Sequence, residues 1–403
     1  MSANFQINET VPLRDVRILD LSRLVAGNMM THVLADLGAD VIKVEPPEGD
    51  SLRAWLINGV AVQWKVYARN KRSIMLDLKD PADKEIMREL VASAQVLVEN
   101  FRPGVLDRLG FSWDTLKAIN PRLVLVRISG WGQSGPYRAK PGFGTLIEAF
   151  SGYAHKNGFS DRPPVLPNLG LADSIAGLYA AMSAMVALRH VEYAGGDGQE
   201  IDISLLEPIL SILGADQAVY KVSGSVPGRL GNRSGMAAPR NIYQTSDGLN
   251  LALAASMQSV VLRLFDAIGR SDLATDPRFM TNEARLKNND GLDEIIGGFI
   301  ASRTLRENLE LFEAAGVTAG PVHDAASLLD DPHVRERGVV VEMEDSDVGT
   351  ILMHAVVPRL SKTPGALQRT APKLNEHRQE ILKELEERRE NAARNGTMVQ
   401  TGD

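Results

Sequence analysis

One aspartate, Asp173, stands at the start of a long segment that is almost free of charge. Residues 162–167 suggest an extended approach, and residues 174–191 are mainly Ala, Met, Leu and other small residues, which suit a buried helix. We therefore expect the Asp173 carboxylate at or near the N-terminus of that helix, where the helix dipole favours its ionised form. An ionised carboxylate can attack an activated carbonyl group. The alternative is that Asp173 only caps the helix, a role that aspartate fills well.

Composition narrows the chemistry that the chain can perform. Its 403 residues, 44% of them hydrophobic, can form one large core or two smaller ones. The chain has no cysteine, which excludes disulfides, thiolate metal sites and a cysteine nucleophile. Its seven histidines are scattered, and we expect them in solvated or core positions rather than in a metal cluster.

The net charge and the apolar runs indicate which partners and which cellular compartment to expect. A formal net charge of −7 argues against broad nucleic-acid binding, although the basic cluster at residues 69–72 could still hold phosphates. Residues 1–10 lack the basic and apolar regions of a secretion signal, and no later apolar run looks long enough to span a bilayer. We expect a soluble, cytoplasmic protein that binds neither nucleic acid nor membrane.

The first half of the chain alternates between strand and helix patterns. Strands are expected at residues 16–21, 40–45, 73–78, 96–99 and 123–129, and helices at residues 29–37 and 81–93. This alternation predicts an α/β fold with a parallel, doubly wound sheet. A nicotinamide-binding enzyme is the obvious alternative. It fails at residues 24–30, LVAGNMM, which stand where the G-x-G-x-x-G turn would be.

The second half of the chain predicts a separate, smaller domain, after which the chain returns to the domain formed by the first half. A strand at residues 200–204 and a helix at residues 205–220 lead into a linker-like stretch and the loop at residues 231–239. A strand at residues 249–254 and several charged helices then suggest a small α+β domain. Strands follow at residues 339–343 and 349–353, before a charged helix. The polar tail, residues 393–403, is expected to be disordered.

Seven short motifs occur in one order along most of the chain. They are VRILDLSRLVAG at 16–27, LADLGADVIKVE at 34–45, RNKRS at 69–73, VENFRPG at 98–104, LDRLG at 106–110, GWGQSGP at 130–136 and the Asp173 segment. In this order the sequence resembles the class III CoA-transferases of the CaiB/BaiF type, a family that includes formyl-CoA transferase and the carnitine CoA-transferases.

The resemblance implies a domain plan and an assembly. A large Rossmann-like CoA-binding domain would comprise residues 1–205 and 325–392, with a linker helix and active-site loop at residues 206–240 and the small domain at residues 241–324. Two such chains would be interlinked as a homodimer.

The resemblance also implies a reaction. CoA would move from an acyl-CoA donor to a free carboxylic acid, with succinyl-CoA and a small mono- or dicarboxylic acid as the expected pair. Asp173 would attack the donor thioester to give a mixed anhydride, and CoA thiolate would convert this to an aspartyl-CoA thioester. CoA and acyl-CoA would be substrates, with no tightly bound cofactor and no metal.

Candidate CoA contacts follow from the matched motifs. Pairing with the CoA phosphates is expected from the cations Arg53, Arg69, Lys71, Arg72 and Arg108. The channel for CoA and the substrate would be lined by Val25, Ala26, Asn100, Phe101 and Phe143. A solvated turn remains the alternative for residues 69–72.

Departures from the family pattern bear on specificity. Gly142-Phe143-Gly144 stands where many members carry Gly-Tyr-Asp, so no tyrosine hydroxyl or second acid is expected there. The apolar Val25 argues against oxalate as acceptor, and residues 234–239 contain one glycine where formyl-CoA transferase has a glycine run. An α-methylacyl-CoA racemase is disfavoured because Phe143 replaces its catalytic histidine and cannot accept a proton. A catalytically silent CoA-binding protein is the remaining alternative.

Overall fold

The computed structural model describes residues 11–399 of the chain, and the side chains of residues 11–394. The described residues divide into two compact units. The large unit comprises residues 11–152, 167–214 and 338–399, and the small unit comprises residues 153–166 and 215–337. The two units meet near residues 214 and 337, and the short segment 153–166 belongs to the small unit. The domain plan from the sequence ends the large domain at residue 205, treats residues 206–240 as a linker and resumes the large domain at residue 325.

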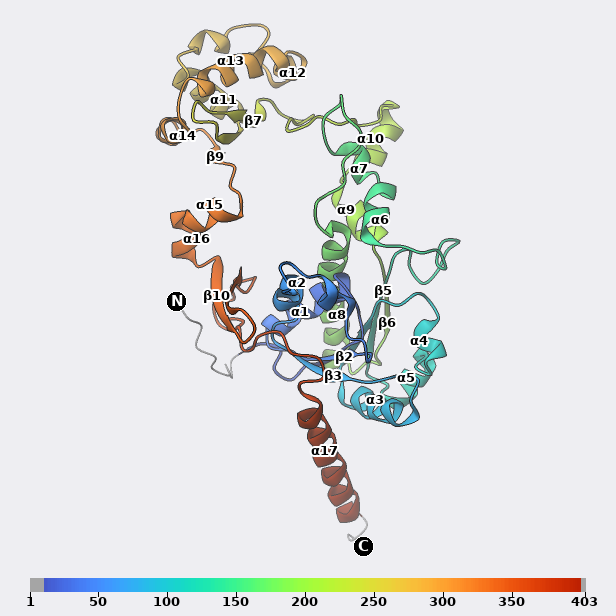
Figure 1. The fold of residues 1–403 in the computed structure, drawn as a ribbon. Coiled ribbons are helices and arrows are strands. Elements are labelled where there is room, and N and C mark those ends of the chain that lie inside the picture. Colours follow the sequence, from blue (N-terminus) through green and yellow to red (C-terminus); the bar gives the residue numbers. More distant parts are fainter. Residues whose placement is uncertain (1–10, 400–403) are drawn as a thin grey trace. The chain divides into compact units, whose positions relative to one another are not determined.

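A six-stranded parallel sheet forms the centre of the large unit (Figure 1). Its strands are β1 (Arg17–Asp20), β2 (Asp40–Glu45), β3 (Lys71–Met75), β4 (Val96–Glu99), β5 (Val124–Ser129) and β6 (Glu200–Ser204). Their order in the sheet is β3-β2-β1-β4-β5-β6. The predicted parallel α/β architecture is confirmed. Between β1 and β4 the strand order reverses, and in such sheets ligands bind beyond the carboxyl ends of the strands at this point.

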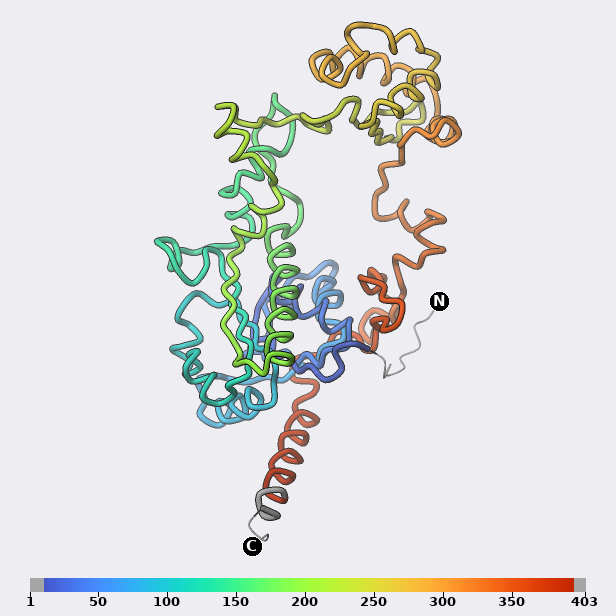
Figure 2. Tube along the Cα trace, turned by 180° about the vertical axis from the view of Figure 1, so that it is seen from behind, coloured from blue at the N-terminus to red at the C-terminus, as the bar shows by residue number. Residues whose placement is uncertain are grey.

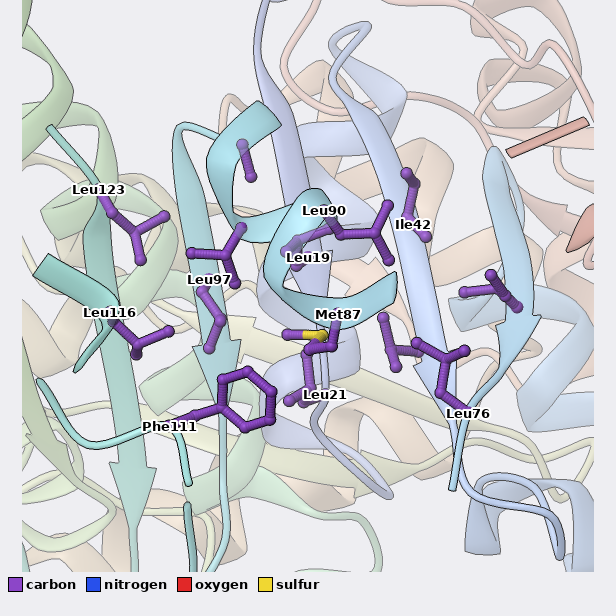
Figure 3. Close-up of a cluster of buried hydrophobic side chains, with 14 of the residues drawn as sticks. Leu19, Leu21, Ile42, Leu76, Met87, Leu90, Leu97, Phe111, Leu116 and Leu123 are labelled. Atoms are coloured by element: carbon purple, nitrogen blue, oxygen red, sulfur yellow. The ribbon is translucent and has the colours of Figure 1, made fainter. Parts of the chain in front are cut away.

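One face of the sheet packs against helix α3 (Pro81–Ser93) through a buried apolar cluster (Figure 3). Leu19, Ile42 and Leu97 project from three neighbouring strands toward Met87 and Leu90 of the helix (Figure 3). Only every second residue of a strand can contribute its side chain to this cluster, because successive residues of a strand point to opposite faces of the sheet. The α3 bounds match the predicted helix, since the preceding aspartate caps its first N–H groups and proline occupies its first position.

The other face is covered by α1 (Ala26–Asp36) and α8 (Leu171–Tyr193), which pack against each other. The contact uses small residues. A methyl group at Gly177 of α8 would lie 2.5 Å from the carbonyl oxygen of Ala26 and 2.8 Å from the Met29 side chain, both on α1. Because most of the residues that α8 buries are alanines, this helix can approach α1 closely.

The remaining helices of the large unit connect these layers. They are α2 (Val62–Tyr67), α4 (Val105–Arg108), α5 (Trp113–Ile119), α6 (Gly144–Phe150) and α9 (Leu206–Ile212), with a 3-10 turn at Ser51–Ala54. The predicted single helix at residues 205–220 is wrong, because α9 and α10 (Asp216–Ser223) are separate helices. Gly214, at φ +83°, lies between them in a left-handed conformation that ends α9.

Residues 338–399 return to the large unit. They form the hairpin of β10 (Val340–Asp345) and β11 (Gly349–His354), then helix α17 (Arg378–Val399). Ile381 and Leu385 of α17 complete the apolar cluster under the sheet. Disorder is expected from residue 393 onward, but the backbone continues as helix to Val399. The expectation is therefore wrong for residues 393–399. Residues 400–403 lie outside the described part of the chain.

The small unit has a core of its own, and Figure 2 traces most of it in yellow and orange. A three-stranded antiparallel sheet is ordered β7-β8-β9, from β7 (Arg240–Gln244), β8 (Asn250–Ala254) and β9 (Ala319–Pro321). Its helices are α7 (Tyr153–Lys156), α10, α11 (Gln258–Ala267), α12 (Asn282–Lys287), α13 (Asn289–Ala301), α14 (Leu305–Ala314), α15 (Ala325–Asp330) and α16 (Pro332–Arg337), with a 3-10 turn at Ser271–Ala274. Leu251, Phe265, Ile296 and Phe312 are fully buried between these elements.

Candidate active site

A cavity of about 70 Å³ lies at the carboxyl edge of the parallel sheet, in the large unit. It is lined by Leu24, Ala26, Asn100, Ile128, Ser129, Gly130, Gly142, Phe143, Asp173 and Leu205. These residues come from the ends of β1, β4, β5 and β6 and from the first turns of α1, α6 and α8. The structure thus brings four predicted site residues, Ala26, Asn100, Phe143 and Asp173, to one cavity at the strand-order reversal.

Asp173 is the third residue of α8, whose first residue is Leu171. The N-cap residue is Gly170, which has no side chain to cap the helix, so Asp173 is not the N-cap residue and the capping alternative is wrong. The carboxylate occupies the space beside Gly144, where a methyl group would overlap its Oδ2 atom. A methyl group on Gly170 would be 3.6 Å from that oxygen and 3.7 Å from the Val25 side chain, so Gly170 lies next to both residues.

The environment of Asp173 favours its neutral form. Burial, with a further contribution from the nearby Glu148 carboxylate, raises the pKa of Asp173 from 3.8 to about 6. A helix N-terminus stabilises a carboxylate by about 0.3–1 kcal/mol, whereas this pKa change corresponds to roughly 3 kcal/mol in the opposite direction. The dipole effect expected from the sequence is therefore outweighed by burial.

Glu148, which the sequence analysis missed, is a buried acid on α6. Its Oε1 atom accepts a hydrogen bond from the backbone N–H of Ala172, at 3.1 Å, so it supplies an acceptor to the uncapped first turn of α8. The available signal was a single acid in the otherwise uncharged helix GTLIEAF. That pattern does not reveal which distant helix the acid faces.

Asn100 joins the two strands at which the strand order reverses. Its side-chain oxygen accepts from the Arg23 N–H at 2.8 Å, and its side-chain nitrogen donates to the Arg23 carbonyl at 2.7 Å. This pair of hydrogen bonds holds the turn after β1 against the end of β4. Asn100 is therefore part of the cavity wall and also fixes the shape of that wall.

The turn after β1 is conformationally strained. Leu24 has φ +62°, a region that residues with a side chain rarely adopt. Asp50 holds it there, accepting from the Leu24 N–H at 3.0 Å and from the Asn28 side chain at 2.8 Å. Strained residues that the surrounding structure holds in place cluster at functional sites, and Leu24 lines the cavity.

A second, larger cavity of about 370 Å³ lies along the same edge of the sheet. Its wall includes Leu21, Arg23, Val44, Glu45, Pro46, Pro47, Glu48, Leu76, Asp77, Leu78, Lys79, Phe101, Val105 and Leu109. Phe101 thus lines this cavity rather than the smaller one. Arg108 is exposed on α4, the helix whose Val105 and Leu109 form part of the wall. Arg23 and Lys79 are cations of this wall that the sequence analysis did not select.

The cations at residues 69–72 do not lie where the sequence analysis placed them. Arg69 and Lys71 are completely buried, and Arg72 is nearly so. Arg69 is paired with Asp36 at 2.6 Å, Lys71 with Asp20 at 3.2 Å, and Arg72 with Asp40 at 2.7 Å. Because their charges are already neutralised inside the large unit, they hold its strands and helices together and offer no charge to a phosphate.

Arg53 is similarly engaged, although one fifth of its side chain is exposed. It pairs with Glu45 at 2.7 Å, and its guanidinium lies 3.7 Å from the centre of the Trp64 ring.

The loop at residues 234–239 belongs to the small unit. Asn282 accepts from the Ala238 N–H at 3.2 Å and donates to the Met236 carbonyl at 2.9 Å, so the loop is fixed at both positions. Among residues 11–394, whose side chains the structure describes, no group of three or more His, Cys, Asp or Glu is arranged to hold a metal ion.

One helix differs from the expectation that no segment could span a membrane. Among the described residues, α8 is long and apolar enough to do so by length and composition, a test that core helices of soluble proteins also pass.

Comparisons with known proteins identify relatives of the chain. The family model described as CoA-transferase family III matches residues 13–378. The chain is 41% identical to the succinyl-CoA–D-citramalate CoA-transferase of Chloroflexus aurantiacus over 93% of its length and 94% of that protein. It is 35% identical to the succinate–glutarate CoA-transferase of Agrobacterium fabrum, covering 94% and 97%.

The fold leads to the same family. The crystal structure of a CaiB/BaiF family protein from Brucella suis superimposes with a TM-score of 0.83 at 34% identity, over 94% of this chain and all of that one. A family model that matches nearly the whole chain, relatives matched over most of their length and this structural agreement all concur. The chain belongs to CoA-transferase family III.

Proposed function

We propose that this CoA-transferase moves CoA from succinyl-CoA to a small dicarboxylic acid through a covalent intermediate on Asp173. The observation that carries the proposal is the Asp173 carboxylate in the cavity at the sheet edge. The donor and acceptor follow from relatives at 35–41% identity, whose names pair succinyl-CoA or succinate with citramalate or glutarate.

The reaction begins at the thioester carbonyl of the donor. An Asp173 oxygen attacks the carbonyl carbon, the carbon–sulfur bond breaks, and CoA leaves as the thiolate with the bonding electrons. The thiolate then attacks the Asp173 carbonyl of the mixed anhydride, which releases succinate and leaves an aspartyl-CoA thioester. The acceptor carboxylate repeats both steps in reverse. One carboxylate therefore suffices, and no water is activated.

CoA would extend along the carboxyl edge of the sheet. The larger cavity suits its nucleotide end, because Lys79 lines it and the exposed Arg108 lies on the adjoining α4. Arg23 of the same wall pairs with Glu48 at 3.6 Å, but this pair is exposed and weak, so a phosphate can replace the carboxylate. The smaller cavity would hold the thioester. Most of its wall is apolar or backbone, which excludes the water that would hydrolyse an anhydride.

Proton exchange at the α-carbon is disfavoured by Phe143. This residue precedes α6 and lines the cavity with an aromatic hydrocarbon, which cannot act as a base. We therefore propose transfer rather than racemisation. The mechanism calls for no tightly bound cofactor, because Asp173 and CoA itself carry the acyl group in turn. We propose a cytoplasmic location and no nucleic-acid partner, in line with the acidic net charge and the absence of cysteine.

We also propose that the protein is a homodimer. Most of the residues that helix α8 buries are small, whereas three of its larger apolar residues are exposed: Leu178, Met182 and Val186 are 50%, 57% and 66% exposed. These three lie four residues apart and so form one stripe on the helix. A second copy covering this stripe accounts for it without a membrane.

Trapping the intermediate tests the proposal. The protein is incubated with succinyl-CoA, quenched with hydroxylamine or borohydride, and its peptides are mapped by mass spectrometry. We expect one modified side chain, that of Asp173, and loss of both adduct and transfer in Asp173→Ala. Asp161→Asn, a change at an exposed acid, serves as control. A parallel reaction with a 2-methylacyl-CoA in heavy water should show negligible deuterium uptake. Full CoA exchange by Asp173→Ala would disprove the mechanism.

A further inference from the structure

Two carboxylates from different helices converge on Gly144. If this glycine had a methyl group, it would overlap Asp173 Oδ2 and lie 3.8 Å from Glu148 Oε1. Gly144 and Glu148 belong to the same helix, one turn apart, so α6 provides both the space for the Asp173 side chain and an acid beside it.

Glu148 is fixed in place. Its side chain is buried, and it accepts a hydrogen bond from the Ala172 N–H, the peptide group next to Asp173 in the chain. Gly144 and Gly170, which lie beside the Asp173 carboxylate, have no side chains, and among the residues that line the cavity Asp173 alone carries a charge. Glu148 is the charged side chain whose field acts on Asp173.

We propose that Glu148 is a positioning residue of the transfer reaction, which orients the first turn of α8 and whose negative charge drives acylation of Asp173. This inference rests on the proposed function of Asp173. The ionised Asp173 is repelled by Glu148 before the reaction. When the new oxygen–carbon bond forms and the carbon–sulfur bond breaks, the negative charge leaves on the CoA sulfur, and the repulsion is relieved.

The repulsion acts on the starting state more than on the transition state, in which charge is already moving to sulfur. An interaction that changes between these two states changes the rate of the chemical step. Glu148 therefore acts on acylation through charge and through the Ala172 hydrogen bond, and the two effects can be separated by substitution.

Glu148→Gln removes the charge but keeps an oxygen that can accept from Ala172. Glu148→Ala removes both. Glu192→Gln, at an exposed acid near the other end of α8, is the matched control. The measurement is single-turnover formation of the Asp173 adduct from succinyl-CoA between pH 4.5 and 9, with succinyl-CoA affinity measured in parallel.

We expect the wild-type rate to rise with pH through an inflection at about 6, where Asp173 ionises. In Glu148→Gln the inflection should move to lower pH, and the plateau rate should fall by roughly threefold to tenfold, a size typical of coupling between neighbouring groups. Glu148→Ala should lose more, and Glu192→Gln should match the wild type. Should Glu148→Gln fail to fold, Glu148→Asp decides the question. Its shorter side chain places the carboxylate farther from Asp173, so the inflection of the rate should again move to lower pH.

An unchanged inflection and plateau in Glu148→Gln, with Asp173→Ala inactive, would overturn the role of Glu148 and leave the proposed function standing. Retention of transfer by Asp173→Ala would instead overturn the proposed function itself.

Discussion

At the scale of single residues, Asp173 combines reactivity with a cost to stability. Burial and Glu148 place its pKa at about 6, above the ordinary value of 3.8. The folded protein therefore binds this proton more tightly than the unfolded chain does. The stability from this group is fully present below about pH 4 and is lost as the pH rises through about 6.

Asp173→Asn should consequently stabilise the protein at neutral and alkaline pH. We expect the free energy of unfolding to rise by up to about 3 kcal/mol above pH 7, and to change little at pH 4. Denaturant unfolding at pH 4, 6 and 8 measures this difference. The exposed-acid variant Asp161→Asn should show no such pH-dependent gain. Equal stabilisation by Asp173→Asn at pH 4 and pH 8 would contradict the assigned cause.

Gly144→Ala should leave the fold intact and lower activity by about 100-fold. Gly144 begins α6 without a left-handed φ, so its backbone tolerates alanine, but the added methyl group would displace the Asp173 carboxylate. A displacement of about 1 Å can reduce rates by about 100-fold. Succinyl-CoA transfer and thermal unfolding measure the two effects. Gly298→Ala, at a helical glycine with nothing within 4 Å, is the control and should be fully active.

The sequence identified Asp173 but not the pair beside it. Asp173 stands out because it is a lone acid within a recognisable motif. Gly144 and Glu148 take their meaning from their position next to α8, and neither residue type nor spacing reveals that position. The same limit explains the misassigned Arg69 and Arg72. Their carboxylate partners lie up to 312 residues away in the chain, so a run of buried cations looks like a solvated one.

At the scale of elements, a buried ionic cluster joins β1, β2 and β3 to α1. Asp20 accepts from Lys43 at 3.1 Å and Lys71 at 3.2 Å, and the hydroxyl of Thr31 on α1 donates to it at 2.6 Å. The two ammonium groups, together with these hydrogen bonds, hold the pKa of Asp20 well below its usual range against the opposing effect of burial. Its stabilising contribution is therefore present at neutral pH and is lost only in strong acid.

Asp20→Asn should destabilise the protein by about 3–5 kcal/mol, because it leaves two buried ammonium groups without this carboxylate. Denaturant unfolding at pH 7 measures the change. Asp197→Asn breaks an exposed pair with Lys117 and should cost under about 1 kcal/mol. If the two variants lost equal stability, the buried cluster would not be what joins these strands.

Element boundaries were predictable where local chemistry decides them. The strand β2 and the helix α3 match their predicted ranges, because an apolar run and a proline-plus-aspartate start define them. The predicted helix at residues 205–220 failed at Gly214, where one left-handed residue separates α9 from α10. A glycine within an apolar period does not show in advance which conformation it will adopt.

At the scale of the whole molecule, the exposed stripe on α8 predicts self-association. Val186→Glu would place an unpaired charge where we propose that a second copy packs, and burying such a charge is strongly unfavourable. We expect the freshly expressed variant to fail to assemble, so that analytical ultracentrifugation at nanomolar to micromolar concentration shows monomer. Val186→Leu keeps the surface apolar and should remain dimeric. A Val186→Glu protein that sediments as the wild-type dimer would place the interface elsewhere.

The docking of α17 also matters while the protein is being made. Strands β1 to β5 are complete once residue 129 has been synthesised, but Ile381 and Leu385, which complete the apolar cluster beneath them, follow about 250 residues later. At a typical elongation rate this delay lasts roughly 13 to 50 seconds. During that interval part of the sheet's apolar face lacks its final cover on the ribosome. The small unit, whose core is formed within residues 243–317, can fold during the same interval. Folding of the large unit is therefore completed only after α17 has been synthesised, and a nascent chain that stalls before α17 would be a natural client for chaperones.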